Sequence, residues 1–105
     1  MESTAGNGSM EVVRVFSALS DSNRLRIVEL LSADGAELTC GAISAALGLS
    51  PSLLSHHLSV LEGARVIDRR REGLWTLNRL RRDEIGRLIA SLQDMVGPLN
   101  DDRLS

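Results

Sequence analysis

The sequence predicts one mostly helical domain in which four helices, a β-hairpin and a last helix follow one another in the order α-α-α-α-β-β-α. Apolar residues recur at helical spacing through residues 10–62 and again through residues 83–99. Between them, residues 65–82 change to a period nearer two, with a glycine in the middle. A chain of 105 residues is long enough to bury one core of its own.

Composition limits the class of protein. Hydrophobic residues are 43% and charged residues 25% of the chain, which is typical of a folded soluble domain. We expect a disordered tail over residues 1–9, the domain over 10–99 and a frayed acidic tail over 100–105. The chain has neither a long apolar run nor a signal-peptide pattern, so we expect a cytoplasmic protein without membrane contact. A single cysteine, Cys40, suits a reducing compartment.

Helix-capping residues set the first two helix boundaries. The first helix is expected from Met10 to Leu19, and Ser20 or Asp21 can cap the second. Gly35 is expected to end that second helix in a left-handed conformation.

The third and fourth helices are separated by a tight turn. Thr39 can cap a short third helix, and Gly48 stops it. Ser50 can cap a fourth helix, in which Pro51 takes the first position and which ends near Glu62. Two helices joined in this way predict a helix-turn-helix.

The fourth helix has one apolar and one polar side. Leucines at spacings of four and three form the apolar side, whereas the polar side carries short side chains. Short polar residues let a helix approach base edges in the major groove of DNA. The polar side comprises Ser52, Ser55, His56 and Ser59.

The neighbouring histidines allow other interpretations. Adjacent helical residues point about 100° apart, so His56 and His57 do not converge on one metal ion. His57 lies nearer the apolar side and is expected to pack there or donate its N–H, and Cys40 is expected to be a small packed residue. A cysteine–histidine catalytic pair has no third orienting group, and no other enzyme motif occurs, so we expect no enzyme.

The arginines gather after the helix-turn-helix. The net charge of −2 argues against a nucleic-acid partner, but residues 65–82 hold seven arginines and two carboxylates, which leaves −7 on the rest of the chain. In this segment RVIDRR and LWTLNRL are the expected strands, and REG is the expected turn between them. We predict that Arg69, Arg70 and Arg71 contact the DNA phosphate backbone next to the fourth helix.

The stretches LSDSNRLRIVELL and ISAALGLSPSLLSHHLSVLEGARVIDRRREGLWTLNRL, together with the helical tail, resemble the ArsR/SmtB winged-helix repressors, small dimeric regulators of bacterial metal and stress operons. The resemblance covers residues 14–96. It implies a palindromic double-stranded operator, an effector that changes DNA affinity, and Ser52, Leu53, Ser55 and His56 at bases or phosphates. His56 and Ser59 stand where relatives often carry basic residues.

The resemblance also implies a homodimer built from the first and last helices. The long apolar stripe of the last helix supports this, because it exceeds what a small core needs; burial within the monomer is the alternative. The expected contact residues are Val13, Phe16, Ile85, Leu88, Ile89, Leu92, Met95 and Val96.

This sequence differs from the family's pattern at the positions where many members bind a metal. Many members carry ELCVC where this chain has ELTCG, residues 37–41, and the last helix offers Asp83, Glu84 and Asp94 but no histidine. We therefore expect no cofactor and at most weak binding of transition metals. Three alternatives remain: a different effector, a partner protein that senses it, or no effector.

The function we predict is sequence-specific DNA binding that regulates transcription, as a repressor of a metal- or stress-related operon. The alternative is a protein-interaction module of the same fold, which pairs with a partner chain and binds DNA weakly or not at all.

Overall fold

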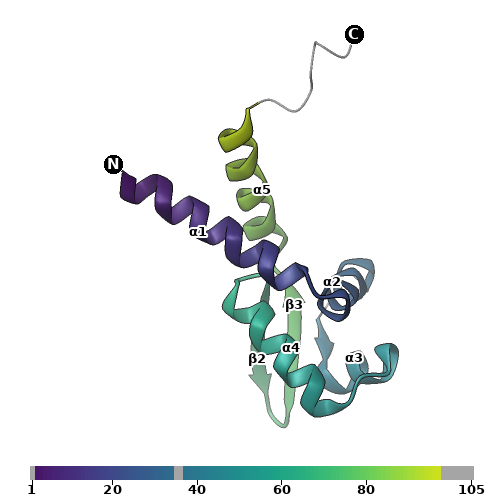
Figure 1. Cartoon of the computed structure of the whole chain (residues 1–105). Helices are drawn as coiled ribbons and strands as arrows, with labels where there is room; N and C mark the ends of the chain where they lie inside the picture. Colours follow the sequence, from purple (N-terminus) through teal and green to yellow (C-terminus); the bar gives the residue numbers. More distant parts are fainter. Residues whose placement is uncertain (1, 35–36, 98–105) are drawn as a thin grey trace.

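The computed structural model describes residues 2–34 and 37–97. Figure 1 shows α2, α3, α4 and the strands gathered into one body, from which α1 and α5 extend. The order of helices is the predicted one, and the hairpin lies between the last two. In chain order the elements are α1 (Glu2–Leu19), α2 (Ser22–Asp34), β1 (Leu38–Thr39), α3 (Cys40–Leu47), α4 (Pro51–Gly63), β2 (Ile67–Glu72), β3 (Trp75–Leu80) and α5 (Arg82–Val96).

Local caps define the helix-turn-helix formed by α3 and α4, as predicted. The Thr39 side chain accepts a hydrogen bond from the backbone N–H of Ala42, which caps α3. Gly48 ends α3 with a φ of 68°, a left-handed conformation that glycine adopts without steric cost. The Ser50 side chain accepts from the N–H of Leu53 at the start of α4.

Asp21 caps α2. Its Oδ1 atom accepts from the backbone N–H groups of Asn23 at 2.8 Å and Arg24 at 3.2 Å. The bond from the Arg24 N–H is the main reason why the pKa of Asp21 lies below its ordinary value. Of the two caps proposed from the sequence, Asp21 therefore has this role; the predicted stop at Gly35 lies outside the described residues.

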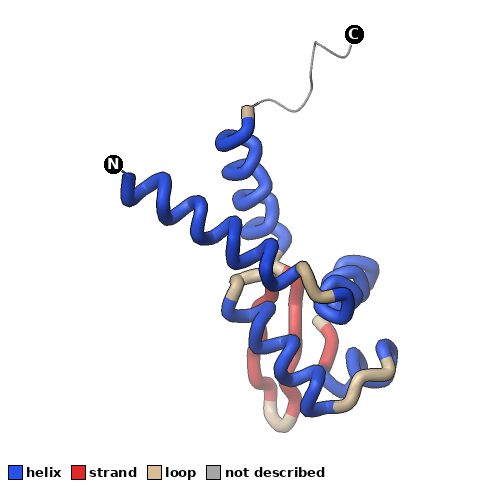
Figure 2. The backbone as a smooth tube through the Cα atoms, in the orientation of Figure 1, coloured by secondary structure: helices blue, strands red, loops and turns tan. Residues whose placement is uncertain are grey.

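The three strands form one antiparallel sheet in the order β1-β3-β2, which Figure 2 shows beside α4. The hairpin turn is Gly73 and Leu74 rather than REG, because the pairing of β2 with β3 continues to Glu72 opposite Trp75. Gly73 has a φ of 63°, as the first central residue of a tight two-residue turn requires. The prediction missed β1, which is only two residues long and so has no readable period.

The core lies between the helices and one face of this sheet. Its members come from five helices, the turn between α3 and α4, the loop after α4, and β2. Asn78 is the buried polar residue of the sheet: its Nδ2 donates to the Leu38 carbonyl, and its Oδ1 accepts from Arg69 Nε, both at 3.1 Å. The largest fully buried side chains are Ile27, Leu31, Ile43, Leu54, Leu58, Leu61, Val66, Ile67 and Asn78.

The beginning of the chain differs from the prediction. Helix α1 begins at Glu2, eight residues before the expected start at Met10, so the stretch expected to be disordered continues the helix. Its polar and glycine-rich composition gives no helical periodicity, and for that reason the sequence did not predict it. Helix α5 ends at Val96, and residues 98–105 lie outside the described part. None of the helices in the described ranges combines the length and apolar character needed to cross a bilayer.

Candidate nucleic-acid interface

Helix α4 buries one side and exposes the other. Leu54, His57, Leu58 and Leu61 are buried in the core. A helix that packs through this stripe must present its opposite side outward. The side chains predicted to read DNA are all exposed, and we call them the reading face: Ser52, Leu53, Ser55, His56 and Ser59.

The two histidines have different surroundings. His56 is exposed on the reading face, whereas His57 has an exposed fraction of only 4%. Their ring centroids are 5.7 Å apart and the ring planes are tilted by 53°. His57 packs on the apolar side as predicted, but its Nδ1 lies 3.2 Å from an Arg24 nitrogen and so acts as an acceptor rather than a donor.

Strand β2 divides the three arginines of the predicted phosphate contact. Successive residues of a strand point to opposite faces, so Arg69 and Arg71 share the face of the buried Ile67, and Arg70 lies on the other face. The sequence prediction treated the three as one group. A period of two divides three consecutive side chains between two faces, and the phosphate contacts of the three arginines stay a prediction.

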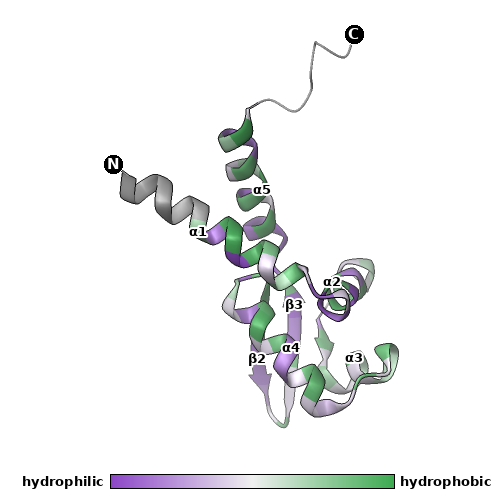
Figure 3. Ribbon diagram, viewed as in Figure 1, coloured by the Kyte–Doolittle hydropathy of each residue, from purple (hydrophilic) through white to green (hydrophobic). Residues whose placement is uncertain are grey.

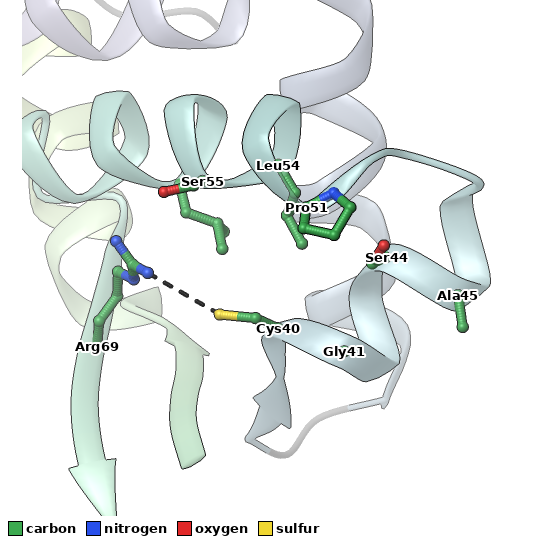
Figure 4. Close-up of a pocket in the computed structure, with 9 residues that line it drawn as sticks. Cys40, Gly41, Ser44, Ala45, Pro51, Leu54, Ser55 and Arg69 are labelled. Atoms are coloured by element: carbon green, nitrogen blue, oxygen red, sulfur yellow. Dashed lines mark hydrogen bonds between the residues drawn. The ribbon is translucent and has the colours of Figure 1, made fainter. Parts of the chain in front are cut away.

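Arg69 faces the helices. Its Nε donates to Asn78 Oδ1 at 3.1 Å, and its guanidinium lies 3.8 Å from a Glu62 carboxylate oxygen at the end of α4. Figure 4 shows this side chain reaching toward Cys40, near Ser55 of the reading face. The Arg69 side chain is only 19% exposed. It therefore packs beneath the surface of the candidate interface and does not project into solvent.

Arg70 is neutralised within the protein. Its Nε and one terminal nitrogen donate to the two carboxylate oxygens of Glu37, at 2.9 and 2.7 Å, and Glu72 lies 3.5 Å away. The bidentate contact lowers the pKa of Glu37 and raises that of Arg70. Glu37 precedes Arg70 by 33 residues, and no local sequence signal pointed to this pair.

Arg71 has surroundings different from those of Arg69 and Arg70. It is exposed, it shares the face of Arg69, and it forms no ion pair within residues 2–34 and 37–97. Its charge is therefore not neutralised by a carboxylate in those ranges.

A cavity of about 310 Å³ opens between α3, α4 and β2, and Figure 4 shows residues that line it. Cys40 lies there, and its sulfur accepts a hydrogen bond from Asn78 Nδ2 at 3.5 Å with an Arg69 nitrogen at 3.9 Å. A cationic guanidinium beside a single thiol does not fit a divalent metal ion. Within the described residues, no three histidine, cysteine or acidic side chains come together as a metal site would require.

A second surface lies on α1 and α5, which pack against each other. Val13, Phe16 and Ile89 are each more than half exposed. Phe16 and Ile89 line an apolar groove of about 160 Å³ between the two helices. Figure 3 shows apolar residues along α5 and the adjoining part of α1.

The predicted dimer residues divide into two groups. Val13, Phe16, Ile89, Met95 and Val96 are exposed. Leu88 is 5% exposed and belongs to the monomer core, and Ile85 and Leu92 are partly buried against that core.

The fold and this interface define a class: winged helix-turn-helix proteins that bind DNA and regulate transcription. The family described as "Bacterial regulatory protein, arsR family" matches residues 21–69. Transcriptional repressor SdpR of Bacillus subtilis is 41% identical over 59 residues, 56% of this chain and 63% of the repressor. An ArsR relative from Halobacterium salinarum is 37% identical over 76 residues, 71% of this chain and 59% of the relative.

The chain is also similar to a solved structure of this class. The homodimeric winged helix-turn-helix DNA-binding domain from Mycobacterium bovis, described as "a possible ArsR-family transcriptional regulator", matches with a TM-score of 0.66 and 31% identity, over 82% of this chain and 78% of that one. The chain belongs to the arsR family of bacterial regulatory proteins, which are regulators and not enzymes. It spans less than two thirds of the length of the Bacillus and Halobacterium relatives.

The division of the arginines gives a matched pair of variants. Arg71→Ala and Arg70→Ala remove the same charge from adjacent positions. We expect Arg71→Ala to weaken binding to all duplex DNA and to reduce the salt slope by about one unit, because one phosphate contact is lost. Arg70→Ala should change the slope by much less, since Glu37 already holds that guanidinium. DNA titrations at several salt concentrations measure the affinity and the salt slope of each variant. Equal losses in the two variants would show that Arg70 and Arg71 do not differ in their contact with DNA.

Proposed function

We propose that the chain is a sequence-specific transcriptional repressor that binds double-stranded operator DNA through the reading face and Arg71. The observation that carries the proposal is the exposed row of short polar side chains on α4, backed by a buried apolar stripe and flanked by an unpaired cation within the described ranges. Hydroxyls and imidazole can hydrogen-bond to base edges, and the guanidinium supplies affinity that does not depend on sequence.

We propose further that the protein acts as a homodimer through α1 and α5. The exposed apolar residues and the groove between these helices favour a second copy, because adjacent apolar side chains from both helices are open to water. The homodimeric state of the M. bovis domain supports a dimer for this chain as well. Two copies related by a two-fold axis carry two reading faces, which matches an operator with palindromic half-sites.

The regulatory signal we propose is not a tightly bound metal. Cys40 is a single thiol beside Arg69, and Glu84 on α5 lies within salt-bridge distance of Arg65, Arg81 and Arg87. The positive charges of these arginines repel a divalent ion at the thiol and at the carboxylate. Transition metals are therefore expected to bind weakly at most. An effector of another kind, or a partner protein that senses it, would then control an operon for metal or stress response.

The second candidate function is a protein-interaction module of the same fold. The apolar surface on α1 and α5 favours it, since that surface could receive a different chain. DNA binding with a strong salt dependence would separate the two functions.

Selection of bound sequences from random duplex tests the reading face. On the selected duplex, Ser55→Ala and His56→Ala should each weaken binding by about tenfold, because a base-specific hydrogen bond is lost. On random duplex the same variants should bind almost as the wild type does. Equal losses on both duplexes would mean that these side chains position the helix but do not specify sequence. No selectable duplex at low salt would favour the interaction module.

Assembly is tested by a charge on the exposed part of α5. Ile89 is 53% exposed, so Ile89→Glu should leave the fold intact while placing an unpaired carboxylate in an apolar dimer contact. We expect a folded monomer in sedimentation, with weak binding to a palindromic site. Leu74→Glu, at the 91% exposed tip of the wing, is the control and should remain dimeric. A dimeric Ile89→Glu variant would place the interface elsewhere.

A further inference from the structure

The helix-turn-helix lacks the side chains that most strongly distinguish one base from another. Residues 38–61 run from β1 through most of α4, and they contain no arginine, lysine, asparagine, glutamine, aspartate or glutamate. Arginine and lysine pair with guanine, asparagine and glutamine pair with adenine, and carboxylates accept a hydrogen bond from cytosine. None of these pairings is available from this segment, so the reading face must distinguish bases through other groups.

The polar groups of the reading face are hydroxyls and one exposed imidazole. Ser52, Ser55 and Ser59 each carry a hydroxyl, which both donates and accepts and so bonds to either kind of base edge. The imidazole of His56 has one donor and one acceptor when it is neutral. Because a hydroxyl suits more than one base, the serines alone specify a base pair weakly.

Leu53 is the one apolar member of the reading face. Its exposed fraction is 42%, and among the described residues it belongs neither to the core nor to the partly buried side chains packed against the core. The next residue, Leu54, is only 1% exposed and carries the packing of this turn. Core packing therefore does not account for a large aliphatic side chain at position 53.

The first turn of α4 fixes where this side chain lies. The Ser50 hydroxyl accepts a hydrogen bond from the backbone N–H of Leu53 at 3.2 Å, and the ring of Pro51 restrains the backbone between them. The buried Leu54 fixes the rotation of the helix about its own axis. Leu53 is thus held at the N-terminal end of α4, and the N-terminal residues of a recognition helix are those that contact base edges.

We propose that Leu53 contacts the 5-methyl group of a thymine in the major groove, and that this contact selects a T·A pair at one position in each half-site of the operator. The inference rests on the proposed DNA-binding function and names a chemical group that the reading face recognises. The thymine methyl group is the apolar feature that a base pair presents in the major groove, and apolar side chains contact it there.

His56 adjoins Leu53 on the surface of α4. Residues three apart in a helix are neighbours, and they are separated by about 4.5 Å along the helix axis. Stacked base pairs are separated by about 3.4 Å. The imidazole and the leucine side chain are therefore close enough to contact the same base pair or adjacent ones, where a hydrogen bond and an apolar contact together specify more than either does alone.

The exchange of thymine for uracil isolates the apolar contact. Deoxyuridine lacks the 5-methyl group but pairs with adenine through the same atoms, so the hydrogen-bonding groups in the major groove are unchanged. Burial of one methyl group is favourable by about fourfold in affinity, which sets the size of the expected effect.

The test scans the selected duplex with deoxyuridine in place of each thymine in turn, at one salt concentration. For the wild type we expect one position in each half-site at which the exchange weakens binding by about fourfold. In Leu53→Ala the loss at that position should fall below about 1.5-fold, since the side chain that covers the methyl group is gone. An undiminished loss in Leu53→Ala would overturn the proposal.

Leu25→Ala is the matched control, because Leu25 is 43% exposed and lies on α2, outside the reading face. It should bind the selected duplex as the wild type does and keep a preference of about fourfold for thymine over uracil. Any effect of the exchange on the shape of the duplex is common to all three proteins and cancels when their losses are compared. Loss of the preference in Leu25→Ala as well would contradict a contact made by Leu53.

Two further outcomes separate this inference from the proposed function. A wild type that binds a selected duplex but has no thymine sensitive to the exchange would reject the contact of Leu53 alone. A wild type that binds no duplex at low salt would reject the DNA-binding function, and this inference with it.

Discussion

The structure depends on how α4 packs into the core. Leu54, Leu58 and Leu61 are less than 2% exposed, and they fix which side of the helix is buried. Because a helix can bury only one side in this way, the short polar side chains face outward as a continuous surface. The rest of the interface follows from this constraint: α3 supports the start of α4, and the hairpin that follows lies along the same helix.

The pleat of β2 then decides which charges belong to that surface. Arg69 and Arg71 share the face of β2 that includes the buried Ile67, whereas Arg70 is turned away and bound by Glu37. The chain has a net negative charge, yet the division of the arginines leaves positive charge on the surface proposed to face DNA. On the other face of β2 the positive charge is paired with a carboxylate. Asn78 holds this arrangement together in the core, because its side-chain bonds to Leu38 and Arg69 connect β1, β3 and β2.

Sequence reasoning succeeded where the signal is local. Thr39 and Ser50 cap their helices within three residues, and the stripe of α4 repeats within one element. It failed where the deciding partner is distant: the Glu37–Arg70 pair, the contact of Arg24 with His57, and the two-residue strand β1 all depend on tertiary structure. The start of α1 at Glu2 was missed because its first residues carry no apolar period.

The central claim is that the reading face and the helix-facing side of the wing form one DNA-binding surface. Nuclear magnetic resonance of the ¹⁵N-labelled protein, titrated with the selected duplex, tests it most directly. The account predicts that signals of the reading face and the side-chain Nε–H of Arg71 shift together, while the Nε–H of Arg70, held by Glu37, stays in place. Shifts at Arg70 that equal those at Arg71, or shifts confined to α1 and α5, would contradict it.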